Sequence, residues 1–242
     1  MRQLSIILTL SLGLVAPASA LSPKWTKCVN KDNAYSPDVA IGACTALIQS
    51  GKENRQNLVI AHNNRGIAYK AKGDYDRAIA DYNKSIGLNP KHVNTYINRG
   101  NVYGLKKDFD HAIADFNEAI ELNPKRADAY YNRGNTYDEN GDFVRAITDY
   151  NKAIELNPKR ADAYYNRGNA YGHKGDYDRA IADYSKAIEL NPKYVSAYVN
   201  RGFCYEKRGD KARAIAGYRH ALSLDPNWQS AKDALKRLGA LP

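Results

Sequence analysis

The chain repeats itself every 34 residues. An Arg-Gly dipeptide recurs at this interval, and a proline keeps the same step after it. A period of this length makes a protein a stack of small units, each of which contacts only its neighbours. Such stacks present long surfaces, and we expect this one to bind other proteins. The dipeptides begin at Arg65, Arg99, Arg133, Arg167 and Arg201, and the prolines are Pro90, Pro124, Pro158, Pro192 and Pro226.

Residues 127–160 show what is repeated. An aromatic residue, a glycine and a second aromatic residue are spaced so that they share one face of a helix. An Asn-Gly-Asp run then ends that helix, because glycine suits a left-handed residue and aspartate caps the next helix. A second apolar stripe of helical period follows, and a proline closes the unit. Each unit is therefore predicted to be two antiparallel helices. These residues are Tyr130, Gly134, Tyr137, Gly141, Asp142, Ala146, Tyr150, Ala153 and Pro158.

This pattern resembles the tetratricopeptide repeat, whose units carry the same order of aromatic residues, glycine, alanines and proline. Five units match, over residues 59–226. The resemblance implies an all-α fold, a right-handed superhelical solenoid of stacked antiparallel helix pairs. Three positions depart from the family pattern. Arg133 and its equivalents stand where leucine is usual, Lys107 replaces a turn glycine, and Lys211 replaces an aromatic residue.

The glycine inside each first helix costs about 1 kcal/mol relative to alanine. We expect it where a neighbouring helix must approach closely, and we pair it with an alanine column on the second helix. Gly134 would face Ala146, with Tyr150 filling the larger space beside them. These columns are predicted to be core, without a site in them.

The repeated arginines have a matching acidic column, which the fifth unit replaces by Gly217. If each aspartate paired with the arginine of the following unit, the last unit would need no aspartate. We therefore predict ion pairs between units, with a structural role. A half-buried bidentate pair can fix register even where its net stabilisation is small. The predicted pairs are Asp81–Arg99, Asp115–Arg133, Asp149–Arg167 and Asp183–Arg201.

The first twenty residues are typical of a secretory signal peptide. Arg2 supplies a positive start, an apolar stretch follows, and Ala18-Ser19-Ala20 is a small-residue cleavage pattern. The apolar stretch has roughly a dozen residues, fewer than the about 20 that span a bilayer. An uncleaved membrane anchor is the alternative. We expect cleavage after Ala20, a periplasmic or secreted protein, and no membrane span in the remaining chain.

The ends of the repeat array are predicted to be capped. Residues 21–58 resemble a half-repeat, a second helix without its first, and residues 227–242 a closing helix. Cys28 and Cys44 both precede the regular units, and export would place them in an oxidising compartment. We predict a disulfide between them, with two free thiols as the alternative. Cys204 occupies a column of small residues and is expected to pack rather than react.

In the tetratricopeptide family the first helices line the concave face, and the resemblance places rows of asparagines and tyrosines there. Amides can donate to and accept from an extended peptide backbone, and tyrosine adds flat contact area. The alternative is that the asparagines satisfy groups inside the stack. Tyr131 and Asp162 stand where an acidic peptide tail would need cations, which favours neutral or basic segments. The candidate residues are Asn98, Asn101, Asp128, Tyr131, Asn132, Asn135, Asp162, Tyr165, Asn166 and Asn169.

The chain carries 36 Lys and Arg against 26 Asp and Glu. The basic residues recur among acidic ones at fixed repeat positions, so we expect solvated faces and no nucleic acid partner. The five histidines show no metal spacing, and no nucleophile motif or phosphate loop is present. We therefore expect no enzyme, metal or cofactor.

Three function hypotheses remain, and none of them names a partner or an oligomeric state. The first is a scaffold that binds protein or peptide partners through its concave face. The second is a structural spacer or self-assembling envelope protein. The third is a basic surface that binds anionic envelope polymer through the inter-unit turns at Lys125, Arg126, Lys159 and Arg160.

Overall fold

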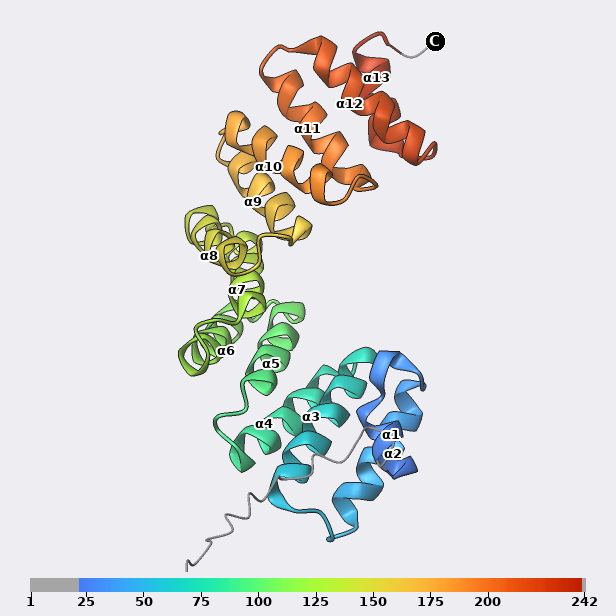
Figure 1. The fold of residues 1–242 in the computed structure, drawn as a ribbon, viewed down its shortest axis with the longest axis vertical. Coiled ribbons are helices and arrows are strands. Elements are labelled where there is room, and N and C mark those ends of the chain that lie inside the picture. Colours follow the sequence, from blue (N-terminus) through green and yellow to red (C-terminus); the bar gives the residue numbers. More distant parts are fainter. Residues whose placement is uncertain (1–21, 241–242) are drawn as a thin grey trace, which may run out of the picture.

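The computed structural model describes residues 22–240, and this part of the chain consists of helices and turns without a strand. Successive helices pack as antiparallel pairs along one array, which confirms the predicted all-α solenoid (Figure 1). The predicted signal peptide, residues 1–20, lies outside the described residues. The five helix pairs are α3 (Arg55–Ala71) and α4 (Tyr75–Leu88), α5 (Val93–Leu105) and α6 (Phe109–Leu122), α7 (Ala127–Glu139) and α8 (Phe143–Leu156), α9 (Ala161–His173) and α10 (Tyr177–Leu190), and α11 (Val195–Lys207) and α12 (Lys211–Leu224). We number them units 1 to 5.

Each second helix begins at an aspartate cap, as the sequence predicts. Asp142 accepts a hydrogen bond of 2.9 Å from the backbone N–H of Arg145, which satisfies one of the free donors at the start of α8. Gly141 before it has a φ of 81°, the left-handed conformation that ends α7. In unit 2 the non-glycine residue Lys107 takes that conformation, with a φ of 60°. The other caps are Asp74, Asp108, Asp176 and Asp210.

The glycine inside each first helix packs against an aromatic ring of its own unit. A Cβ atom on Gly134 would lie 2.9 Å from Cε1 of Tyr150, closer than carbon atoms can pack. The aromatic ring rather than the predicted alanine is thus the nearest neighbour of the glycine. The alanine column follows in two units, where the carbonyl oxygens of Ala112 and Ala214 would lie 3.2 and 3.3 Å from a Cβ on Gly100 and Gly202. Ala146 is fully buried, but the ring of Tyr150 makes the close approach.

The repeated arginines pair with the aspartates of their own unit, so the predicted pairing between units is wrong. Arg133 donates from Nε and Nη2 to the two oxygens of Asp149, both at 2.7 Å. Its third nitrogen, Nη1, donates to Asn117 of the preceding unit. One guanidinium thus bonds within its own helix pair and also to the neighbouring unit. The prediction from the sequence had assumed that it could do only one of these. The same bidentate pairs are Arg65–Asp81, Arg99–Asp115 and Arg167–Asp183.

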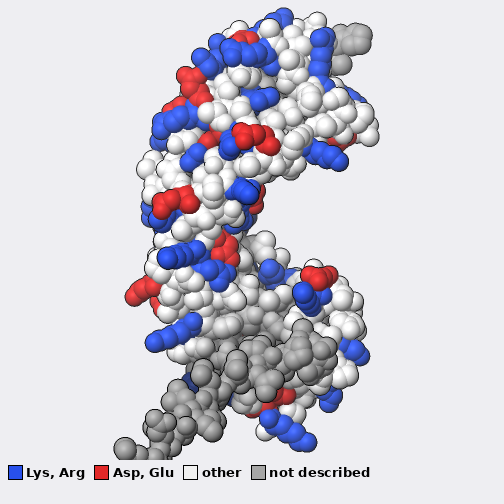
Figure 2. Space-filling view, in the orientation of Figure 1, with Lys and Arg blue, Asp and Glu red and all other residues white. Residues whose placement is uncertain are grey.

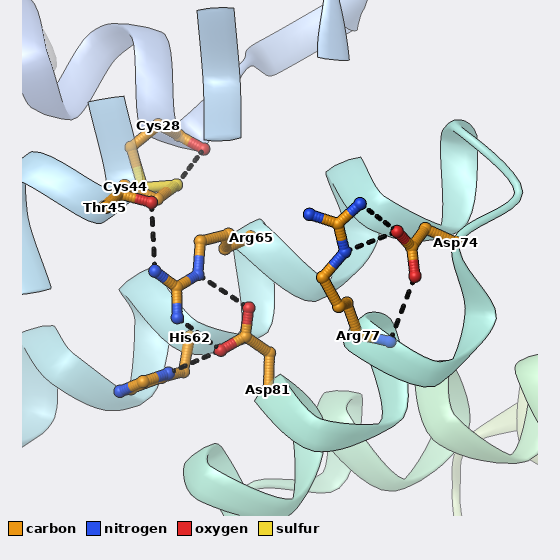
Figure 3. Close-up of polar contacts among 8 residues, drawn as sticks. All are labelled: Cys28, Cys44, Thr45, His62, Arg65, Asp74, Arg77 and Asp81. Carbon is orange, nitrogen blue, oxygen red and sulfur yellow. Dashed lines mark hydrogen bonds and ion pairs between the residues drawn. A yellow bond between two sulfur atoms is a disulfide. The ribbon is translucent and has the colours of Figure 1, made fainter. Parts of the chain in front are cut away.

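Arg201 shows what happens where the aspartate is missing. Gly217 occupies the position of the acid, and Arg201 keeps only the link to the preceding unit, a 3.0 Å hydrogen bond to Oγ of Ser185. In unit 1 the aspartate instead has an additional partner, because Asp81 accepts hydrogen bonds from both Arg65 and His62 (Figure 3). Burial raises the pKa of Asp81, but these hydrogen bonds outweigh burial and hold the pKa below its usual value.

The N-terminal segment contains two α-helices, where the sequence indicated one. A short helix α1 (Pro23–Val29) and a single 3-10 turn (Lys31–Asn33) precede α2 (Pro37–Gln49). The predicted disulfide is present, and Cys28 and Cys44 are both buried where α1 meets α2 (Figure 3). The disulfide therefore ties α1 to the array.

At the other end, α13 (Gln229–Arg237) covers unit 5 and buries Leu235. Cys204 is buried within the array, which raises the pKa of its thiol to about 11. The thiol is therefore protonated at neutral pH, in line with a packing role.

Candidate partner-binding site

The array curves, and the first helices of the central units lie on the side toward which it curves (Figure 1). In that view α6 and α8 form the outer edge, whereas α5, α7 and α9 lie inside. The candidate residues all lie on these inner helices. Their contacts decide which of them are free to meet a partner.

Most of the asparagines bond to each other and to tyrosines between units 3, 4 and 5. Asn135 Oδ1 accepts from the hydroxyl of Tyr150 at 2.8 Å and from Nδ2 of Asn166 at 2.9 Å. The same Nδ2 also donates to the hydroxyl of Tyr131 at 3.0 Å. These contacts satisfy buried polar groups within the stack, the alternative interpretation of the asparagine rows.

An equivalent network joins units 4 and 5. Asn169 accepts from Tyr184, and Asn200 donates to both Asn169 and Tyr165. In unit 2, Asn98 donates to Asn63 of unit 1.

The network stops between units 2 and 3, because two residues there lack a hydroxyl. Phe116 replaces the tyrosine that would donate to Asn101, and Ile97 replaces the tyrosine that would accept from Asn132. Within the described residues, the side chains of Asn101 and Asn132 make no hydrogen bond. Their amides are therefore the ones left available for another chain.

A hollow of about 260 Å³ lies at this junction, and we call it the unit 2–3 pocket. Gly104 contributes no side chain, and Leu105 stands at the mouth with 58% of its surface exposed. Lys107 and Glu139 bring opposite charges to the same pocket. It is lined by Gly100, Asn101, Gly104, Leu105, Lys107, Phe116, Asn132, Asn135, Thr136 and Glu139.

The unit 2–3 pocket can recognise a polar backbone beside an apolar group. Each free amide offers both a donor and an acceptor, which matches the alternating groups of an extended peptide. Leu105 and the ring of Phe116 add apolar surface. Lys107 holds a left-handed conformation that a glycine would adopt more easily, and such local strain is typical of functional positions.

Neighbouring arginines hold both candidate aspartates and Tyr131, whereas Tyr165 stacks on the ring of Tyr194. Arg126 donates to both oxygens of Asp128, and this hydrogen bonding holds the pKa of Asp128 below its usual value. Arg160 pairs with Asp162, and its guanidinium carbon lies 3.6 Å above the centre of the Tyr131 ring. Both acids are thus neutralised, which leaves no strongly acidic rim on these units.

Two features of this surface were not predicted from the sequence, although the repeat columns contain the residues. The presence of Phe116 among tyrosines was the signal for a free Asn101, because a phenyl ring cannot donate a hydrogen bond. Asp138 was also missed: its Oδ1 is buried and has no hydrogen-bond partner among the described residues. Ile67 and Phe203 occupy the repeat position of Asn101 and are partly exposed, so apolar side chains flank the asparagine row.

The basic residues do not gather into one patch on the face shown in Figure 2, where acidic residues lie among them. Arg126 and Arg160 are already paired, whereas Lys125 and Lys159 in the same two turns have no acidic partner within residues 22–240. Over residues 22–240, no three His, Cys, Asp or Glu side chains are grouped to hold a metal ion. No helix in the same range has the length and apolar character of a membrane span.

Comparison with known proteins identifies the repeat. The tetratricopeptide repeat family matches residues 59–92, 93–126, 127–160 and 161–194, and a second model with the same description matches 184–216. No curated protein matches the chain.

Several solved structures are similar to this one. A structure of MamA is 30% identical with a TM-score of 0.65, over 71% of this chain and 93% of MamA. A second MamA structure is 32% identical with a TM-score of 0.64, over 69% and 96%. YrrB, described as a tetratricopeptide repeat protein with an unusual peptide-binding site, is 24% identical with a TM-score of 0.66, over 81% and 100%.

Proposed function

Because this chain belongs to the tetratricopeptide repeat family, we propose that it is an exported scaffold that binds a protein or peptide partner through its concave face. The repeats make the chain a protein-interaction scaffold, since such arrays expose long surfaces for partners. Export, the concave binding face and the nature of the partner are the new parts of the proposal.

The observation that carries the proposal is the pair of free amides in the unit 2–3 pocket. Asn101 and Asn132 face the same hollow, while their equivalents in units 3 to 5 are occupied by tyrosines and by each other. A peptide backbone would give these amides the partners that Phe116 and Ile97 cannot supply. The paired acids at Asp128 and Asp162 leave the neighbouring surface without a strong charge preference, which suits a neutral segment.

Export is supported by the signal-peptide pattern and by the disulfide. Disulfides persist in oxidising compartments and are rare in the cytosol. Cell fractionation tests export directly: the protein should lack residues 1–20 and should appear in the periplasm or the medium. A full-length protein in the cytosol, with Cys28 and Cys44 reduced, would contradict this part of the proposal.

The partner can be trapped from the pocket itself. A photo-crosslinking residue placed at Leu105, at the mouth of the unit 2–3 pocket, should capture a partner in cells. Val144 is the matched control, because it is also apolar and is 61% exposed but lies in the first turn of α8, outside the pocket. Equal crosslinking from both positions, or crosslinks from Val144 alone, would show that the pocket is not the binding face.

Once the partner is known, adding a single hydroxyl group to the pocket tests whether the amide of Asn101 contacts that partner. Phe116→Tyr should let the new hydroxyl donate to Asn101, as Tyr150 does to Asn135. Withdrawal of one hydrogen bond from the partner should weaken binding about tenfold without loss of stability. Tyr184→Phe is the control: it removes the equivalent hydroxyl from Asn169, which does not line the unit 2–3 pocket, and should not weaken binding. Unchanged affinity of the Phe116→Tyr protein, measured by calorimetry, would exclude Asn101 as a contact.

Binding of anionic polymer is the second candidate function, carried by Lys125 and Lys159. Affinity for a polyanion falls steeply as salt rises, because screening weakens exposed charges. Groove binding to a neutral segment should change little over the same range. A structural spacer should bind neither, and Phe116→Tyr should leave its self-association unchanged.

A further inference from the structure

A second cavity lies at the N-terminal end of the array, outside the candidate residues. It has a volume of about 480 Å³ and is enclosed by α1, the loop that follows it, the start of α2 and the face of α3. Ligand pockets commonly span about 300–1,000 Å³, so this one has room for a substantial group. We call it the N-terminal pocket.

The lining of the N-terminal pocket carries no charged side chain among its described residues. This is unusual in a chain in which 26% of residues are charged. Val29 and Ile67 line it and are each 38% exposed, which leaves apolar surface in contact with water. Asn33 and Asn64 add amide groups. An ion entering this pocket would lose its hydration without gaining a counter-charge, whereas an apolar group would gain burial.

The wall of the N-terminal pocket is braced by covalent and hydrogen bonds. Cys28, in the wall, is fixed by its disulfide to α2. Asn30 accepts a hydrogen bond of 2.8 Å from the backbone N–H of Tyr35 and donates one of 3.0 Å to the carbonyl of the same residue. Asn30, Asp32 and Asn33 all have φ angles between 46° and 58°, a conformation that non-glycine residues rarely adopt in succession. A braced wall keeps a pocket open before its ligand arrives, which lowers the cost of binding.

The N-terminal pocket includes residues of α3 at the repeat positions that the candidate asparagines hold on α5. Asn64 is equivalent to Asn98, and Ile67 to Asn101. A chain that followed the inner helices from unit 3 toward the N-terminus would therefore end at this pocket.

We propose that the N-terminal pocket receives an uncharged apolar side chain, of the leucine or phenylalanine class, from the peptide segment that binds the concave face. The inference rests on the proposed function, because it takes the occupant to be part of that partner. It predicts which peptides bind: those with an apolar residue at one end of the segment and uncharged residues along the part that meets the unit 2–3 pocket.

Short blocked peptides test the N-terminal pocket alone. The probes are acetylated and amidated Gly-Gly-Xaa-Xaa-Gly-Gly peptides in which both variable residues are phenylalanine, leucine, lysine or aspartate. Phenylalanine and leucine peptides should shift the backbone amide resonances of Tyr35 and Ile67 in ¹⁵N spectra of the protein. Lysine and aspartate peptides should bind at least ten times more weakly. Absence of shifts up to millimolar phenylalanine peptide, or equal shifts with lysine peptide, would overturn the proposal.

Matched variants separate this inference from the proposed function. Ile67→Gln should reduce the shifts about tenfold, and folding is not at risk because this side chain is partly exposed. Phe203→Gln changes the same repeat position on α11, where the side chain is 44% exposed, and should have no effect. Asn101→Ala should also leave the probe peptides bound while it weakens the captured partner. If Ile67→Gln and Phe203→Gln weaken the probes equally, the probes bind exposed apolar groups in general and the N-terminal pocket is not their site.

Discussion

At the scale of single residues, we expect loss of the arginine from an arginine–aspartate pair to cost more stability than loss of the aspartate. Asp149 is 5% exposed and Arg133 is 19% exposed, so the acid depends more on its partner. Arg133→Ala would leave a buried carboxylate unpaired and should cost about 3–5 kcal/mol of unfolding free energy. Asp149→Ala should cost less, because Arg133 keeps Asn117, as Arg201 keeps Ser185 beside Gly217. Urea denaturation measures both costs.

A double variant provides the control for this asymmetry. Removing Asp149 as well should recover much of the loss caused by Arg133→Ala, because the unpaired charge is then gone. A double variant as unstable as Arg133→Ala alone would mean that the arginine acts through packing on Tyr130 rather than through its charge.

Asp138 gives a prediction with a defined pH dependence. Burial raises the pKa of Asp138, His173 partly opposes this, and Glu139 adds to it. A carboxyl whose pKa is raised in the folded state destabilises the fold above that pKa and ceases to do so when acid protonates it. Asp138→Asn should therefore stabilise the protein at pH 7 by about 1 kcal/mol, with a smaller gain near pH 4. Thermal melts at both pH values test this, with Glu121→Gln as the exposed control, because Glu121 does not contribute to the pKa of Asp138. A gain independent of pH would contradict the prediction.

The residue scale is also where sequence reasoning reached its limit. The columns of Arg133 and Asp149 predicted a pair, but a period alone cannot decide between partners that lie one repeat apart. The loss of Asp at Gly217 fitted either choice, because the arginine bonds within its unit and to the preceding unit at once. Side-chain geometry decided the pairing, and the sequence carries no direct record of it.

At the scale of elements, the repeat predicted most of the helices. Proline, turn glycine and the aspartate cap mark most boundaries from α3 to α12, because each acts through local backbone chemistry. The exceptions are the start of α3, which Asn54 caps, and the turn of unit 2, where Lys107 replaces glycine. Helix α1 was not predicted, since seven residues are too few to show an apolar stripe. Its place depends on a covalent bond to α2 rather than on a pattern of its own.

The disulfide should therefore matter locally. Cys28→Ser combined with Cys44→Ser should lower stability by about 3 kcal/mol, the effect of opening a loop of this size in the chain-entropy model. Hydrogen exchange should accelerate in α1 and in the loop to α2, whereas α13 should be unaffected. Cys204→Ala removes a buried thiol without touching the disulfide and should leave exchange in α1 unchanged. Uniform acceleration along the array would show that the disulfide stabilises the whole solenoid.

At the scale of the whole molecule, the junction between units 2 and 3 has fewer polar links than its neighbours. An outer ion pair crosses two of the other junctions, Lys106–Asp76 between units 1 and 2 and Arg208–Asp178 between units 4 and 5. Between units 3 and 4, Val144 stands in place of the acid, but the inner network is present there. The position equivalent to Lys106 in unit 3 is Asn140, which cannot pair with Asp110. The inner network of asparagine and tyrosine stops at the same junction. Each missing link is worth only about 1 kcal/mol or less, but both are missing at one place, beside the unit 2–3 pocket.

We therefore expect the array to bend most easily at this junction, where a partner would bind. Spin labels at Ala80 and Thr148 span it, and labels at Thr148 and Ala216 span the two junctions that follow. These three positions are exposed and equivalent in the repeat, so the two pairs are matched.

The distance distribution between Ala80 and Thr148 should be the broader of the two. Ile97→Tyr combined with Asn140→Lys should narrow it, because the new hydroxyl can accept from Asn132 and the new ammonium can pair with Asp110. Binding of the partner should also narrow this distance distribution, because the partner, like the new side-chain bonds, would bridge the junction between units 2 and 3. Equal widths for the two label pairs, or no narrowing in the double variant, would mean that apolar packing alone sets the stiffness of the array.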